Sequence, residues 1–308
     1  MIKKILLKIV NLLEIPVKQT NWYNTKLLNR NNYPTNQWYR KNNERNFDIV
    51  NIGSSSILHA FDYEGLNVKA YNWALQPQSL DFCFYILKTY FSILKKGGTV
   101  CIGLSPFTGI TNKNDKRSAP LLTRYLGVLN EEYIDDYGKI KRKYDHPLLY
   151  DTKKAIKHLI RDIPPKYNDE IQLLNSDQYK TDAENWIKGW MNEFSIKDLN
   201  LPVKKESKSN LQKRKELLIE IIDFCKEREL NPVVIIPPVH SSLRQHFTLE
   251  FHKNYIKEFI SVAKGKNVIV KDFLLSDKYP DELFLNSFFL NKDGAKKFTK
   301  DILSEINF

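Results

Sequence analysis

The chain has few of the residues from which small rigid sites are built. Its 308 residues include only 3 cysteines, Cys83, Cys101 and Cys225. Their odd number and wide spacing exclude a disulfide framework and a cysteine-based zinc site, so a reducing compartment, or indifference to redox state, follows. No Gly-rich turn of the kind that holds dinucleotides or nucleoside phosphates follows a predicted strand. We therefore expect no cofactor and no bound metal.

Long apolar runs are also absent. The N-terminal segment MIKKILLKIVNLLEIPV is interrupted by Lys8, has no small-residue cleavage site and is too short to span a bilayer. Its apolar residues fall on one broad face beside three lysines, which predicts an amphipathic helix. Two interpretations stay open: a helix packed on its own domain, or an interfacial anchor on an anionic membrane. Without an evident cleavable signal, we expect a cytoplasmic protein, peripheral at the membrane under the second interpretation.

The charge is strongly positive. Lys and Arg number 48 against 36 Asp and Glu, which gives a net charge of +12. This balance suits nucleic acid, anionic lipid or acidic glycan. The basic residues are mostly dispersed, and no Arg-rich stripe with interleaved aromatics, zinc finger or helix-turn-helix pattern occurs, so we expect no nucleic-acid partner.

Five short apolar runs predict the strands of a buried sheet. They read FDIVNIG, LNVKAYN, GTVCIGL, NPVVIIPP and KNVIVKDF. Near-continuous apolar runs of this length are typical of parallel strands that are covered on both faces. Helical patterns at 79–96, 208–229 and 291–306 alternate with them. The alternation predicts an α/β fold with a doubly wound parallel sheet of about five strands.

The alternation breaks between about residues 107 and 206. This stretch has no convincing strand, and we interpret it as a helical insertion that covers the C-terminal edge of the sheet. Trp186 and Trp190 lie one helical turn apart there, either as core aromatics or as a sugar-stacking platform. The expected organisation is an N-terminal helix and lead-in over 1–45, followed by one α/β domain over 46–308.

The residues after each predicted strand indicate acyl chemistry. Ligands of doubly wound sheets bind at the carboxyl ends of the strands. There the chain has GSSS, NWALQPQS, SPF and PPVHSS, which are rich in hydroxyls and amides and poor in acidic groups. One serine suffices to cap a helix, so the three after Gly53 suggest that one is held for chemistry.

Taken in order, these blocks resemble the SGNH (GDSL-type) hydrolase superfamily. The nearest branch includes proteins similar to the D-alanine transfer protein of teichoic acid synthesis and proteins associated with surface polysaccharides. The resemblance covers 47–106 and 208–306 and implies a flavodoxin-like sheet with Ser55 as nucleophile. It also implies oxyanion or substrate contacts from Asn72 and Gln76 in the second block and from Ser105 in the third.

The last block departs from the family pattern. In LFLNSFFLNKDGAKKFT, Asn286 stands where the family has Asp, and Phe289 stands where it has the catalytic His. Phe cannot accept a proton, so an active serine needs another base. His240, after the fourth strand, is the expected displaced base, and His59, one turn beyond Ser55, is another candidate.

Three functions remain as hypotheses. The first is an acyl hydrolase or acyltransferase of the cell envelope that acts on a polysaccharide or its lipid-linked precursor through an atypical serine site. The second is a non-catalytic descendant, or pseudoenzyme, that binds an acylated glycan or a partner enzyme. The third is a peripheral membrane assembly factor that uses the N-terminal helix and the positive charge.

Overall fold

The computed structural model describes most of the chain. The described residues are 2–23, 38–39, 43–111, 119–162 and 174–306. Two parts of the expected lead-in, 24–37 and 40–42, and two parts of the expected insertion, 112–118 and 163–173, lie outside them.

The chain forms two compact units. One comprises Met1–Asn43 and Lys116–Glu170, and the other comprises Glu44–Asp115 and Ile171–Phe308. We call them the helical unit and the sheet unit. The insertion expected over 107–206 is thus divided between the two units, and its first half groups with the N-terminal segment rather than with the sheet.

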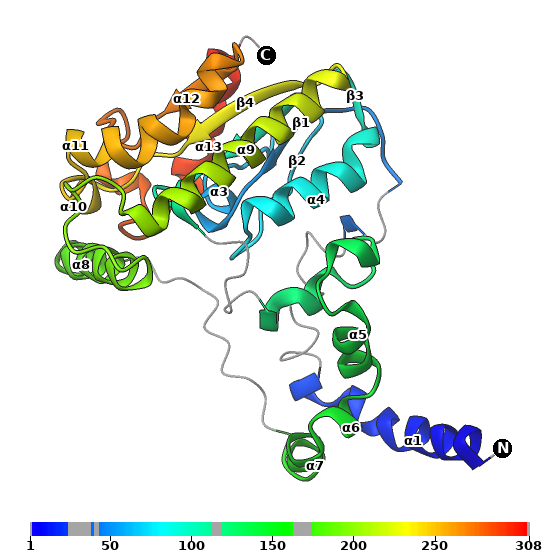
Figure 1. Cartoon of the computed structure of the whole chain (residues 1–308). Coiled ribbons are helices and arrows are strands. Elements are labelled where there is room, and N and C mark those ends of the chain that lie inside the picture. Colours follow the sequence, from blue (N-terminus) through cyan, green and yellow to red (C-terminus); the bar gives the residue numbers. More distant parts are fainter. Residues whose placement is uncertain (1, 24–37, 40–42, 112–118, 163–173, 307–308) are drawn as a thin grey trace. The chain divides into compact units, whose positions relative to one another are not determined.

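The sheet unit contains five parallel strands, as predicted (Figure 1). They are β1 (Phe47–Ile52), β2 (Ala70–Asn72), β3 (Leu94–Gly103), β4 (Asn231–Ile236) and β5 (Ile269–Asp272). The order is β2-β1-β3-β4-β5, the flavodoxin-like order of a doubly wound α/β fold. In the register, Asn51 pairs with Asn72 on one side and with Cys101 on the other, which aligns the carboxyl ends of the three strands.

Helices cover both faces of this sheet. The α-helices in the described part of the sheet unit are α3 (Ser55–Leu58), α4 (Leu80–Tyr90), α8 (Ser176–Glu193), α9 (Lys205–Glu227), α10 (Ser241–Arg244), α11 (Leu249–Phe251), α12 (Glu258–Gly265) and α13 (Lys292–Glu305), with a π-helical segment at His252–Lys257. One face carries α4, α9 and α12 (Figure 1). On the other face, Ile57 of α3 and Phe298 of α13 pack with Ile49 and Ile235 of the strands in one buried cluster. Both faces are apolar, which is why the strands read as continuous apolar runs.

Element boundaries differ from the expectation at several points: β2 covers only the last three residues of LNVKAYN, and α9 begins at Lys205 rather than at 208. The helix expected over 79–96 ends at Tyr90, and β3 already begins at Leu94. Leu94 pairs with Phe47 of β1, and the chain bends only at Gly97, where φ is 74°. Apolar residues at helical spacing continue through 91–94, so the pattern alone does not show that strand pairing replaces the helix there.

The helical unit contains the amphipathic N-terminal helix that was expected. It comprises α1 (Ile2–Gln19), α5 (Tyr137–Asp145), α6 (Pro147–Tyr150) and α7 (Thr152–Ile160), with 3-10 segments at Ala119–Tyr125 and Glu131–Tyr133. Helix α1 contacts α6 and α7, and Val17, Trp22, Tyr23 and Ala155 form a small buried core. Among the described residues, no helix has the length and apolar character needed to cross a bilayer.

Candidate functional site

Helix α3 lies unusually close to the ends of two strands. A Cβ added at Gly53 would lie 2.5 Å from Ile57, and one added at Gly103 would lie 2.2 Å from the same side chain. Only glycine at both positions lets Ile57 seat α3 over the carboxyl ends of β1 and β3. This packing fixes Ser54, Ser55 and Ser56 at that edge of the sheet.

The three serines have different surroundings. The Ser54 hydroxyl accepts a hydrogen bond from the backbone N–H of Gln78 at 3.2 Å and does not cap α3. Ser56 is buried, and its hydroxyl has no hydrogen-bond partner among the described residues. Ser55 is half-buried, and its hydroxyl likewise bonds to no described residue. Ser55 is therefore the serine of the three that is both partly accessible and uncommitted.

Asn286 and Phe289, which stand where the SGNH resemblance expects Asp and His, have structural roles. The Asn286 side-chain oxygen accepts hydrogen bonds from the backbone N–H groups of Phe288 at 2.9 Å and Phe289 at 2.8 Å, which closes a tight turn. The Phe289 ring is 2 % exposed and stacks on His59 with the ring centroids 4.6 Å apart. The position that the resemblance gives to a catalytic imidazole is thus occupied by a ring that packs on another imidazole.

His59 lies one helical turn after Ser55. Its backbone N–H donates to the Ser55 carbonyl at 3.1 Å, and residues four apart on a helix have Cβ atoms about 5–6 Å from each other. The His59 Nε2 atom is buried and has no hydrogen-bond partner among the described residues. Burial lowers the pKa of His59, while a hydrogen bond with the Gln76 side chain acts in the opposite direction. A lowered pKa keeps the imidazole neutral at pH 7, the form that accepts a proton.

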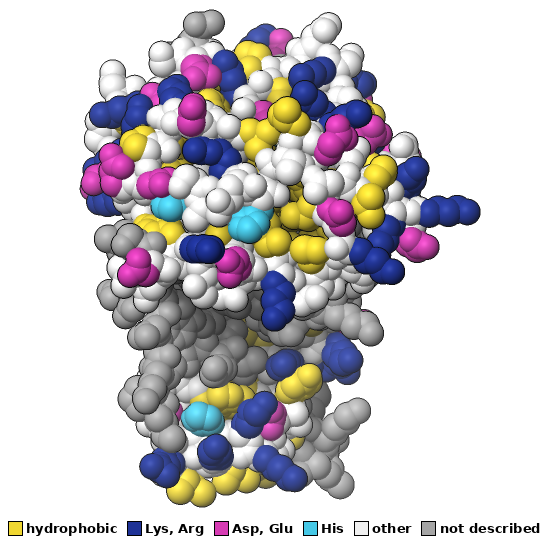
Figure 2. All heavy atoms as spheres, turned by 90° about the vertical axis from the view of Figure 1, so that its left-hand side faces the viewer, with side chains coloured by type: hydrophobic (Ala, Val, Ile, Leu, Met, Phe, Trp, Pro, Cys, Tyr) yellow, Lys and Arg dark blue, Asp and Glu magenta, His cyan; other side chains and the backbone are white. Residues whose placement is uncertain are grey.

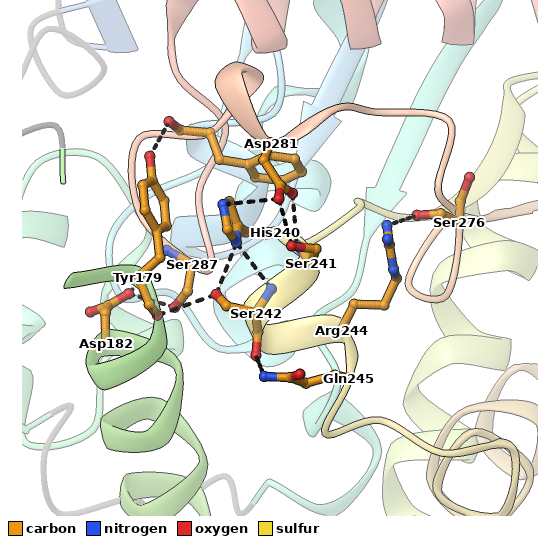
Figure 3. Close-up of polar contacts among 11 residues, drawn as sticks. Tyr179, Asp182, His240, Ser241, Ser242, Arg244, Gln245, Ser276, Asp281 and Ser287 are labelled. Atoms are coloured by element: carbon orange, nitrogen blue, oxygen red, sulfur yellow. Dashed lines mark hydrogen bonds and ion pairs between the residues drawn. The ribbon is translucent and has the colours of Figure 1, made fainter. Parts of the chain in front are cut away.

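His240 lies at the end of β4, as expected, within a dense polar cluster (Figure 3). Its Nδ1 accepts from the Ser242 backbone N–H at 3.0 Å and lies 2.8 Å from the Ser242 hydroxyl. Its Nε2 lies 3.6 Å from Asp281, and its ring stacks on Tyr179 of α8 at 4.0 Å. Only 7 % of His240 is exposed. Both ring nitrogens are therefore engaged, and the residue caps α10.

Asp281 stabilises this arrangement. Burial opposes ionisation of the carboxyl, but hydrogen bonds from the Ser241 side chain and backbone and the nearby His240 and Arg244 hold its pKa below the usual value. Burial lowers the pKa of His240, and the Asp281 carboxylate opposes that shift. Within the described part of the chain, no hydrogen bond or ion pair joins His240 to Ser55. The role of His240 as base for Ser55 stays a prediction.

Asn72 is the most fully bonded of the expected site residues. Its side-chain oxygen accepts from the Asn51 amide at 2.6 Å and from the Ala74 backbone N–H at 3.0 Å. Its amide donates to the carbonyls of Leu58 at 3.0 Å and Phe61 at 3.3 Å. The two amide bonds tie the end of β2 to the end of α3 and the segment after it, so Asn72 shapes the site through the backbone.

Gln76 and Ser105 remain candidates for contact with an oxyanion or substrate. Gln76 is exposed, and its side chain forms a hydrogen bond with His59 that acts to raise the pKa of the imidazole. Gln76 therefore lies near the Ser55 edge of the sheet. Ser105 follows β3 and is half-buried; its hydroxyl lies 3.0 Å from the Thr108 hydroxyl, which also accepts the Ser105 N–H. Their roles stay predictions.

Trp186 and Trp190 belong to an aromatic cluster next to His59. Their rings are 5.2 Å apart, and each lies 5.0 Å from Phe288. Trp186 also contacts Phe289 edge-on at 5.8 Å. These contacts favour the interpretation as core aromatics, and they place α8, the second half of the expected insertion, at the carboxyl edge of the sheet.

The described residues include no group of three or more His, Cys, Asp or Glu side chains that could hold a metal ion. All three cysteines are free and buried. The donors that do cluster, around His240, are mostly hydroxyls and backbone groups, which suit hydrogen bonding better than metal coordination.

Sequence patterns did not reveal two features of this edge. The stacking of Phe289 on His59 joins residues that are 230 positions apart, and the partner of His240, Asp281, lies in a stretch without a strand or helix pattern.

No protein-family model matches the chain, and no curated protein shows significant similarity to it.

Proposed function

We propose that the chain is an SGNH-like acyl hydrolase or O-acyltransferase with Ser55 as nucleophile. The observation that carries the proposal is the uncommitted, half-buried Ser55 hydroxyl at the carboxyl end of β1 in a doubly wound sheet. As the first residue of α3, Ser55 also has a backbone N–H without an intrahelical partner, which can stabilise an oxyanion. Phe289 and Asn286 make this an atypical site.

His59 is the base that the contacts favour. Proton transfer requires rotation of the Ser55 side chain toward the buried Nε2 atom of the neutral His59 imidazole, which lies one turn further along and has no hydrogen-bond partner among the described residues. The Ser55 oxygen attacks the acyl carbonyl carbon while His59 takes the hydroxyl proton. Collapse of the tetrahedral intermediate expels the alcohol, which receives that proton. Water or a glycan hydroxyl then attacks the acyl-serine and regenerates Ser55.

The substrate that fits the resemblance is an acylated polysaccharide or its lipid-linked precursor. Gln76 and Ser105 flank the Ser55 edge as polar contacts for such a group. Work on a lipid-linked precursor suits a protein that lies peripherally at the cytoplasmic side of a membrane. Both the location and the acyl group stay predictions.

A second candidate is a non-catalytic protein that binds glycan or a partner enzyme at the same edge. Asn286 and Phe289 favour it, because both side chains serve packing and the turn rather than proton transfer.

Replacement of Ser55 separates these candidates. We expect the wild-type protein to hydrolyse simple aryl acetates slowly, and Ser55→Ala to reduce the rate to the uncatalysed background. Ser242→Ala is the matched control, because it removes the hydroxyl beside His240. Loss of activity in Ser242→Ala alone would transfer the site to the His240 cluster. No hydrolysis by the wild type, with an unchanged circular dichroism spectrum, would support the binding candidate.

A further inference from the structure

The positive charge of the chain is concentrated in the helical unit. Residues 1–43 and 116–170 contain 20 Lys and Arg against 10 Asp and Glu, a net charge of +10. The sheet unit contains 28 against 26, a net charge of +2. The excess over the whole chain is therefore carried almost entirely by less than a third of its residues, which makes this unit attractive to an anionic partner.

The helical unit also exposes most of the large apolar side chains that face solvent. Of the 12 exposed large hydrophobic residues in the described part of the chain, 9 lie in this unit. They are Ile9, Leu12, Leu13, Ile15, Leu149, Tyr150, Ile156, Leu159 and Ile160. Helices α1, α6 and α7, which carry them, contact one another in this small unit. Figure 2 shows apolar and basic side chains next to each other in the lower part of the view.

Helix α7 shows how unusual this surface is. In a helix that packs on its own domain, the apolar side chains face inward. In α7 only Ala155 is buried, whereas Ile160 is 82 % exposed and Ile156 is 46 % exposed. Lys153 and Lys157 are exposed on the same helix. Exposed aliphatic side chains flanked by lysines are typical of helices that lie in the interface of an anionic membrane.

A pocket in the same unit supplies a place for an anionic head group. It has a volume of about 420 Å³, and Lys143, Lys154, His158, Trp22 and Tyr150 contribute to its lining. Lys143 lies over the Tyr150 ring at 4.4 Å, and His158 stacks on Trp22 at 5.7 Å. The Nδ1 atom of His158 is buried, has no hydrogen-bond partner among the described residues and lies 4.0 Å from the Asp162 carboxylate. Asp151 contributes the acidic group of the lining and pairs with Lys154 at 3.0 Å.

We propose that the helical unit docks on an anionic lipid bilayer, with the exposed side chains of α1, α6 and α7 in the interface and a lipid phosphate in the pocket. A protein partner fits less well, because the cores of protein interfaces are depleted in lysine. Single-stranded nucleic acid would need exposed aromatic platforms, and the exposed residues are mainly aliphatic. This inference rests on the proposed function only for the idea of a lipid-linked substrate.

Co-sedimentation of the full chain with vesicles tests the docking. We expect binding to vesicles of equal parts phosphatidylcholine and phosphatidylglycerol, weak binding to phosphatidylcholine alone, and a loss of binding at high salt. Leu12→Ser and Ile160→Ser should each weaken binding about tenfold or more. Lys143→Ala with Lys154→Ala should weaken binding to the anionic vesicles about tenfold and reduce the preference for them. Leu249→Ser is the matched control, because Leu249 is 77 % exposed but lies in the sheet unit.

Several results would overturn the proposal. The first is that the protein binds both kinds of vesicle equally well, and the second is that it binds neither. The third is that Leu249→Ser weakens vesicle binding as much as Ile160→Ser does. Binding of DNA or of inorganic phosphate without vesicle binding would assign the charge to a soluble anion. The ester assay distinguishes this failure from that of the catalytic proposal, because aryl acetates are soluble and need no membrane.

Discussion

Replacing His59 by glutamine is expected to slow the hydrolysis of aryl acetates by about two to four orders of magnitude, the usual contribution of a general base. Gln keeps a polar side chain next to Gln76 and Phe289 but cannot accept the Ser55 proton. The loss should fall on kcat, with KM little changed, because His59 acts on the proton and not on substrate affinity. Steady-state kinetics on purified wild type and variant give the comparison.

The pH profile of the wild-type rate adds a second readout. The neutral imidazole is the active form, so the rate rises with pH through the pKa of His59 and is constant above it. Since burial lowers that pKa below the usual value of about 6.5, the rate should already be at its plateau at pH 7. His240→Gln tests the competing base: a large loss in that variant, with none in His59→Gln, would assign the proton transfer to His240.

Introducing the residues that the SGNH resemblance expects at positions 286 and 289 gives the complementary test. Asn286→Asp keeps an oxygen that can accept the N–H groups of Phe288 and Phe289, and Phe289→His supplies a new imidazole beside His59. In the His59→Gln background this pair should recover activity that depends on Ser55. In the wild-type background it should add little. An equal gain in both backgrounds would mean that His59 contributes nothing.

Asp81→Ala is expected to cost about 3–5 kcal/mol of folding free energy. Asp81, in the first turn of α4, accepts hydrogen bonds from both terminal nitrogens of Arg214 on α9. The two residues are 6 % and 5 % exposed, and the Arg214 Nε has no hydrogen-bond partner among the described residues. Without Asp81 the guanidinium stays buried without a counter-charge, and α4 loses its polar contact with α9.

Thermal unfolding followed by circular dichroism measures this effect. For a unit of roughly 200 residues, a loss of this size lowers Tm by about 10 °C. Asp223→Ala is the matched control, because Asp223, on α9 like Arg214, pairs with Lys266 at 2.9 Å and both side chains are more than a third exposed. It should cost at most about 1 kcal/mol. Similar losses in the two variants would show that burial of the Asp81 pair has no special energetic weight.

The strands of the sheet could be predicted because burial of a strand produces a run of apolar residues that is visible in the local sequence. The central strands β1, β3 and β4 are largely buried between the helices, so runs such as NPVVIIPP are almost entirely apolar and end at small or polar residues, whereas the edge strands β2 and β5 are more exposed. The end of α4 could not be predicted, because Leu94 pairs with Phe47 of a distant strand. Pairing between distant strands leaves no periodic signal in the sequence. The division of the insertion between two units also depends on long-range packing, in which Ala155 joins Val17.

The placement of the candidate site residues could be predicted for the same reason, whereas their roles stay predictions. Ser55 and His240 follow strands, and the sheet rule puts both at the carboxyl edge. Which nitrogens are free depends partly on residues that are distant in the sequence. Asp281 lies near Nε2 of His240, whereas Phe289 covers His59, whose Nε2 has no hydrogen-bond partner among the described residues. A histidine one turn after a serine is visible in the sequence, but only the stacking on Phe289 links it to the position where the SGNH resemblance expects a catalytic histidine.

The central claim is that Ser55 is a reactive nucleophile, and labelling with a fluorophosphonate tests it most directly. Intact-mass spectrometry followed by peptide mapping should find one adduct, on Ser55. Labelling should be absent in Ser55→Ala and much slower in His59→Gln. A wild-type protein that stays unlabelled after long incubation, or one that carries the adduct on Ser242, would contradict the claim.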